Sequence, residues 1–189
     1  MLKVKKIGFF GGCFNPPTIA HMEIVKKALQ ECQLDKIVFV PMGDKYSKSD
    51  LISFEHRYNM LNFFVNNIDN IEISDMQKNQ KEKMYAIDTF KKIEKAHENS
   101  QIFFIMGIDN FIKMQEWKSY NELMKYHYIV FKRENISVEG IKFPNVQFVE
   151  FDFAISSTKI RELIKRNKSL KTLLTSDVEN YIKENNLYK

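Results

Sequence analysis

The chain has 189 residues, of which 44% are hydrophobic, so it can bury a full core as one α/β domain over residues 1–189. No stretch approaches about 18 consecutive apolar residues, which excludes an ordinary membrane-spanning helix. Cys13 and Cys32 are too few for a disulfide framework, and a reduced cytoplasmic protein is expected. The net charge of +5 comes from scattered basic residues, which favours general lysine enrichment or attraction of small anionic substrates over nucleic-acid binding.

The hydrophobic pattern predicts strands and helices that alternate along the chain. Such alternation implies βαβ units, and hence a parallel sheet with helices on both faces. The apolar run 102–106 is typical of a strand that is buried on both sides. In such sheets ligands bind beyond the carboxyl ends of the strands. Strands are predicted at 4–10, 36–40, 71–74, 101–106, 127–131 and 146–151, and helices at 19–32, 54–65, 85–95, 109–114, 120–125, 156–166 and 177–184.

A glycine turn joins the first strand to the first helix, and residues 8–21 read Gly-Phe-Phe-Gly-Gly-Cys-Phe-Asn-Pro-Pro-Thr-Ile-Ala-His. Gly11 and Gly12 have no Cβ, so the backbone can approach a phosphate closely. The helix begins near Thr18, and its first N–H groups favour an anion. The segment is neither a Walker loop nor a Gly-x-Gly-x-x-Gly fingerprint. A lone helical histidine is usually structural, but this context makes His21 a candidate phosphate ligand.

A second segment, residues 155–161, reads Ile-Ser-Ser-Thr-Lys-Ile-Arg. Ser156 and Ser157 are favourable residues at a helix start. Arg161 follows one turn later, and a guanidinium can bond two phosphate oxygens at once. The alternative is a capped surface helix with no ligand. The pairing with the first segment favours a phosphate site.

Together the two segments resemble the (H/T)xGH and ISSTxxR motifs of the nucleotidyltransferase superfamily, and within it the bacterial nicotinate-nucleotide adenylyltransferases. The resemblance implies a Rossmann-like, doubly wound parallel sheet that ends in C-terminal helices. It also implies that His21 contacts the α-phosphate of ATP, that Thr18 bonds the phosphates and that Arg161 adds a charged contact. Ala20 and Asn15 depart from the usual Gly and Asp. The implied ATP-binding residues are Gly11, Gly12, Cys13, Phe14, Gly107, Asp109, Ile155, Ser156 and Ser157.

The middle of the chain carries the resemblance to enzymes that act on a pyridine mononucleotide. The family's Tyr-Thr-x-Asp-Thr reads Tyr-Ala-Ile-Asp-Thr at 85–89, and its Ile-x-Gly-x-Asp followed by Trp-Lys is present at 105–109 and 117–118. The Pro-Pro-His that usually precedes the family's lysine is absent before Lys48. The resemblance implies that Trp117 stacks on the pyridine ring. The implied substrate-binding residues are Lys48, Tyr85, Ala86 and Trp117.

The resemblance implies transfer of AMP from ATP to nicotinate mononucleotide, which gives nicotinate adenine dinucleotide and pyrophosphate. Mg²⁺ is expected to arrive with ATP, because the four histidines show no metal-ligand spacing. Neither a nucleic acid nor a membrane is expected as a partner, and homo-oligomer formation stays open. Two alternatives also stay open: a sister enzyme that uses nicotinamide mononucleotide or another phosphate, and a nucleotide-binding regulator without turnover. A nucleic-acid binder is the least supported.

Overall fold

Six parallel strands form one sheet in a computed structural model, which describes residues 4–46, 50–66, 68–132, 136, 143–152 and 155–189. The strand order is β3-β2-β1-β4-β5-β6, so the direction of winding reverses between β1 and β4. This is a Rossmann-like order, and the predicted parallel sheet is confirmed. The strands are β1 (Lys5–Gly12), β2 (Lys36–Pro41), β3 (Ile71–Ile73), β4 (Ser100–Gly107), β5 (His127–Lys132) and β6 (Val146–Glu150).

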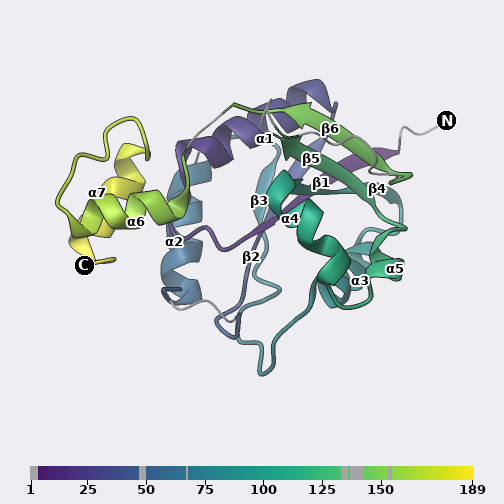
Figure 1. Cartoon of the computed structure of the whole chain (residues 1–189), viewed down its shortest axis with the longest axis horizontal. Helices are drawn as coiled ribbons and strands as arrows, with labels where there is room; N and C mark the ends of the chain where they lie inside the picture. The colour runs from purple at the N-terminus through teal and green to yellow at the C-terminus, as the bar shows by residue number, and fades with distance from the viewer. Residues whose placement is uncertain (1–3, 47–49, 67, 133–135, 137–142, 153–154) are drawn as a thin grey trace.

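Helices cover both faces of the sheet, as predicted (Figure 1). Residues of α1, α2, α6 and α7 share one buried cluster, and residues of α3, α4 and α5 share the other. None of the helices among the described residues is long and apolar enough to cross a bilayer. The helices are α1 (Ile19–Glu31), α2 (Phe54–Val65), α3 (Ala86–Ala96), α4 (Ile108–Lys113), the 3₁₀ turn η1 (Met114–Glu116), α5 (Tyr120–Leu123), α6 (Ser157–Lys165) and α7 (Ser176–Glu184).

Alternate residues of each central strand enter opposite cores. Phe9 contributes to the core beneath α3 and α4, whereas the next residue, Phe10, contributes to the core beneath α1 and α2. Val38 and Phe39 divide in the same way on β2. Because both neighbours along a strand are buried, the strands need continuous apolar sequences rather than an apolar-polar alternation.

The predicted element boundaries agree with the structure to within two residues. The largest differences are two residues: α5 ends at Leu123 instead of Lys125, and β1 continues through Gly11 and Gly12 instead of ending at Phe10. Gly11 pairs with Val40 and Gly12 with Pro41, so the parallel ladder extends the strand into the glycine turn. Pro41 is accordingly the last residue of β2 and not the residue after it. The glycines therefore lie at the carboxyl edge of the sheet, at the reversal point.

Candidate active site

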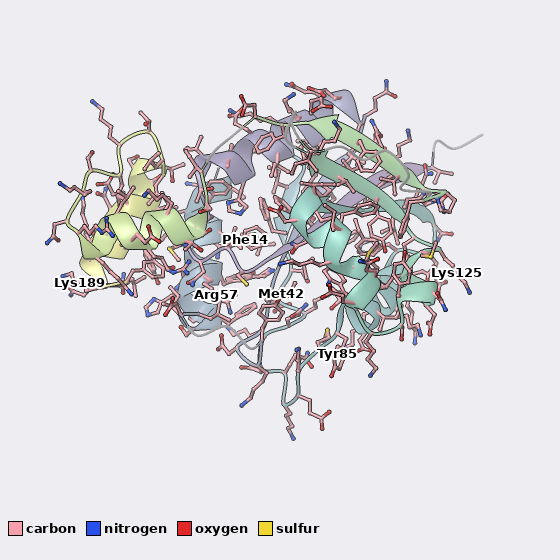
Figure 2. All side chains as sticks on the ribbon, viewed as in Figure 1. Phe14, Met42, Arg57, Tyr85, Lys125 and Lys189 are labelled. Atoms are coloured by element: carbon pink, nitrogen blue, oxygen red, sulfur yellow. The ribbon has the colours of Figure 1, made fainter. Side chains whose placement is uncertain are left out.

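Two adjoining cavities open at this edge of the sheet. The large cavity, about 600 Å³, lies beside the glycine turn, α1 and the start of α6. The small cavity, about 300 Å³, lies between the ends of β1, β2 and β4 and the start of α3. In Figure 2, Phe14 of the large cavity and Tyr85 of the small cavity lie on opposite sides of Met42. Residues that line both cavities are Gly11, Met42, Tyr46, Met106 and Asn110.

All nine residues predicted to bind ATP line the large cavity, and so does His21. They come from three places in the sequence: the glycine turn, the end of β4 and the start of α6. Two other predicted residues, Thr18 and Arg161, are not among the residues that line it. Asp109 is the acidic member of the described lining.

The glycine turn is compact because Phe14 folds back into the core. Phe14 has φ of 48°, which is uncommon for a residue with a side chain, and its ring is buried against Phe10 and Phe39. A Cβ on Gly12 would lie 2.9 Å from the Phe14 ring, so this position requires glycine. The backbone between β1 and α1 is thus held at the wall of the large cavity.

His21 is held in one tautomer by the start of its own helix. The backbone N–H of Thr18 donates to Nδ1 of His21 at 2.9 Å, and the Thr18 hydroxyl lies 2.9 Å from the same atom. Since a backbone N–H can only donate, Nδ1 is an acceptor and the proton of the neutral ring is on Nε2. Thr18 itself is fully buried, so in this structure its hydroxyl contacts His21. The predicted bond from Thr18 to phosphate stays a prediction.

Burial between aromatic rings keeps the His21 ring neutral. The ring centroid is 5.8 Å from that of Phe10 and 5.2 Å from that of Phe14. This burial lowers the His21 pKa to about 4. The hydrogen bond that Nδ1 accepts from the Thr18 N–H also favours the neutral ring. At neutral pH the ring therefore offers an uncharged Nε2–H donor.

We expect stability to fall as pH decreases from about 6.5 towards about 4, because unfolded His21 takes up a proton in this range and folded His21 does not. Above this window the ring is neutral in both states and contributes nothing. Within it the slope is at most about 1.4 kcal/mol per pH unit. Urea unfolding at several pH values would show a shallower decline for His21→Gln than for the unsubstituted protein. Identical declines would contradict the burial of a neutral ring.

The start of α6 borders the large cavity through two serines with different partners. The Ser156 hydroxyl accepts from the Lys159 backbone N–H at 3.2 Å and caps the helix, as predicted. The Ser157 hydroxyl donates to the carbonyl of Pro16 at 2.8 Å and so joins α6 to the loop before α1. Backbone N–H groups of the first turn are left for a ligand, and the helix dipole favours an anion there.

Arg161 lies behind the loop that borders the large cavity. Its Nη1 donates to the carbonyl of Asn15 at 3.0 Å, and its Nη2 lies 3.7 Å from a carboxylate oxygen of Asp50. The side chain is buried in this position. These contacts are with protein groups, and the predicted direct contact between Arg161 and phosphate stays a prediction.

The small cavity contains three of the four residues predicted to bind the second substrate: Tyr85, Ala86 and Trp117. The fourth, Lys48, lies outside the described residues. Sequence reasoning missed Lys83 as a lining residue, and Lys118 appeared only as part of a motif. Their ammonium groups lie 5.5 Å and 4.4 Å from the centre of the Tyr85 ring. Two cations, and the carboxylate of Glu116, are thus present in a lining that is otherwise mostly apolar.

A nucleotide-sized cavity bordered by a glycine turn and a helix start, beside an aromatic one, at the reversal point of a parallel sheet, is typical of a nucleotide-handling enzyme. Residues 9–163 match the Cytidylyltransferase-like family model, and the chain belongs to this family. A probable nicotinate-nucleotide adenylyltransferase of Clostridium tetani is 35% identical, over 98% of this chain and all of the relative. One of Acholeplasma laidlawii is 34% identical, over 95% of this chain and 96% of the relative. Within the broader class, the chain is a member of the nicotinate-nucleotide adenylyltransferase family.

Solved structures show the same fold. The nicotinic acid mononucleotide adenylyltransferase of Plasmodium falciparum, complexed with NaAD, has a TM-score of 0.86 at 24% identity and covers 97% of both chains. The same enzyme complexed with APC has a TM-score of 0.84 at 23% identity. At these identities the likeness concerns the arrangement of the chain.

Proposed function

We propose that this enzyme transfers AMP from ATP to nicotinate mononucleotide and releases pyrophosphate. The observation that carries the proposal is the pair of adjoining cavities with a shared wall at Gly11 and Met42. ATP would occupy the large cavity, with its triphosphate between the glycine turn and the start of α6. The mononucleotide would place its ring in the small cavity beside Trp117. Its 5′-phosphate would then meet the α-phosphate where the cavities join.

The reaction proposed is direct attack of the 5′-phosphate oxygen on the α-phosphorus, with pyrophosphate as the leaving group. Such a transfer needs alignment of two anions and donors for the charge that develops on the α-phosphate. His21 would give one such donor through Nε2–H, which the Thr18 backbone holds in the required tautomer. The backbone N–H groups at the start of α6 would receive the leaving pyrophosphate. No side-chain nucleophile is needed for this chemistry.

The residues around the large cavity fit a Mg²⁺ ion that is carried by ATP. The described residues contain no cluster of three or more His, Cys, Asp or Glu side chains that could hold a metal ion. Asp109 is the single carboxylate in the described lining, so phosphate oxygens and water would complete the coordination. When bound, the ion would neutralise charge on the triphosphate.

Nicotinate mononucleotide should be used at least roughly tenfold more efficiently, in kcat/KM, than nicotinamide mononucleotide. The start of α3 near Ala86 has N–H groups that favour a carboxylate, and Lys83 and Lys118 add positive charge to the cavity lining. An amide would present its NH₂ to these donors and leave them unpaired, at a cost of about 1–3 kcal/mol for each buried group. Pyrophosphate release with ATP and each mononucleotide measures the ratio.

Trp117→Ala is the matched control for this selectivity. The indole offers a flat face to either ring, so its removal should weaken both substrates and leave their ratio nearly unchanged. Equal efficiencies for the acid and the amide, or a preference for the amide, would contradict the proposed substrate. Absence of turnover with any mononucleotide would favour a regulator that only binds nucleotides.

A further inference from the structure

The loop after the glycine turn is held from behind by side chains of two distant helices. Arg57 of α2 donates from Nη1 to the carbonyl of Cys13 at 3.1 Å. Arg161 of α6 donates to the carbonyl of Asn15, and Ser157 donates to that of Pro16. Three of the four carbonyls between residues 13 and 16 are therefore bound to side chains that lie far away in the sequence.

Asn15 is the centre of this arrangement and is completely buried. Its Nδ2 donates to the carbonyl of Asp50 at 2.7 Å, and its Oδ1 lies 3.5 Å from the backbone N–H of Ile52. The strongest contact of Oδ1 is with the C-terminal end of the chain, where the Tyr188 hydroxyl donates to it at 2.9 Å. One side chain thus joins the loop, the 50–52 segment and the last residues of the protein.

Tyr188 reaches Asn15 across 173 positions of sequence. Its ring is buried, and burial raises the pKa of its hydroxyl well above the ordinary value, so the group is a neutral donor at any physiological pH. In Figure 2 the C-terminal end, marked by Lys189, lies on the side of Arg57 away from Met42 and the cavities. Tyr188 therefore acts on the loop from behind and does not line either cavity among the described residues.

The opposite side of this loop borders the large cavity, where ATP is proposed to bind. Cys13, Phe14 and Asn15 all line the large cavity. In a trans peptide the C=O and the following N–H point in opposite directions, so the Cys13 carbonyl bound to Arg57 turns the Phe14 N–H away from Arg57. The hydrogen bond to Arg57 thus sets the orientation of the Phe14 N–H. The Asn15 and Pro16 carbonyls precede prolines, which have no N–H, so their hydrogen bonds fix the path of the loop, and a loosened loop would aim the Phe14 donor less well.

We propose that Tyr188 is a positioning residue for the transfer reaction, and that it acts through Asn15 on the loop at the α-phosphate. It forms no contact with substrate. Its hydroxyl fixes the Asn15 side chain, which in turn fixes the backbone that borders the large cavity. The C-terminal end of the chain is on this basis a functional part of the active site.

The test compares Tyr188→Phe with a matched control, Tyr181→Phe, in the full-length protein. The Tyr181 hydroxyl also joins the C-terminal region to the rest of the molecule, through His56 at 3.0 Å and Asn59 at 3.1 Å, but both of these partners are on α2 and not on the loop. Both substitutions remove one hydroxyl and keep the ring. For Tyr188→Phe we expect kcat to fall by roughly three- to tenfold, the range for one lost hydrogen bond, with KM values nearly unchanged. For Tyr181→Phe we expect kcat to stay at the unsubstituted value.

Hydrogen exchange of the 11–16 segment gives a readout that does not depend on turnover. Tyr188→Phe should speed exchange in this segment, whereas Tyr181→Phe should speed it only in α2 and α7. Similar kcat values for the two variants, or unchanged exchange at 11–16 in Tyr188→Phe, would overturn the proposal. If neither protein turned over nicotinate mononucleotide, the exchange result would still decide the role of Tyr188, so the two proposals can fail separately.

Discussion

His21→Ala is expected to lower kcat by roughly 10²–10³, the usual cost of losing one oriented donor to developing charge. Binding of ATP should stay within about tenfold, because the glycine turn and the start of α6 still surround the triphosphate. The physical reason is the fixed tautomer: Thr18 occupies Nδ1, so the Nε2–H is the donor that the substitution removes. Single-turnover kinetics measures the effect on the transfer step, and calorimetry with MgATP measures the effect on ATP binding.

His56→Ala is a suitable control for this prediction. His56 is also a partly buried helical histidine, but its Nδ1 contacts the Tyr181 hydroxyl, and it lines neither cavity. Its loss should affect packing between α2 and α7 and leave kcat unchanged. A folded His21→Ala variant with unchanged kcat would remove His21 from the proposed mechanism.

The fold could be predicted from sequence because each element has a local cause. Apolar runs such as 102–106 mark strands that are buried on both sides, and Ser53 before α2 and Ser156 before α6 cap their helices. The boundary at β1 could not be predicted, since the two glycines are strand residues only through pairing with Val40 and Pro41. The residues of β2 that pair with these glycines are far from them in the sequence, so local propensities carry no information about this pairing.

The candidate site could be predicted where its residues follow strand ends, because topology alone brings these ends together. Six of the nine predicted ATP-binding residues lie at or just after the ends of β1 and β4 and line the large cavity for this reason, whereas Ile155, Ser156 and Ser157 line it from the start of α6. Side-chain direction could not be predicted: Arg161 has motif spacing, yet its guanidinium contacts the Asn15 carbonyl behind the loop. The hydrogen bond between Tyr188 and Asn15 cannot be predicted from the local sequence around either residue, because it depends on how the last helix packs against the rest of the protein.

Arg57 is expected to contribute most to stability among the side chains around the loop. It is fully buried, and its Nε donates to the carbonyl of Ile52 at 2.9 Å while Nη1 donates to that of Cys13. Its Nη2 donates to a carboxylate oxygen of Asp44 at 3.0 Å. Burial lowers the Arg57 pKa and Asp44 opposes that change, so the carboxylate helps to keep the guanidinium charged in the interior.

Arg57→Ala should lower the free energy of unfolding by about 3–5 kcal/mol, because two partly buried carbonyls lose their donor and a cavity replaces the guanidinium. The other half of the same ion pair should matter far less. The Asp44 side chain is 55% exposed, and Asp44→Asn keeps an acceptor oxygen beside water, so a loss of about 1 kcal/mol or less is expected. Urea unfolding of both variants measures the difference between the two losses of unfolding free energy. Equal losses of unfolding free energy in the two variants would mean that the stabilisation comes from the ion pair with Asp44, and not from the hydrogen bonds of Arg57 to the carbonyls of Cys13 and Ile52.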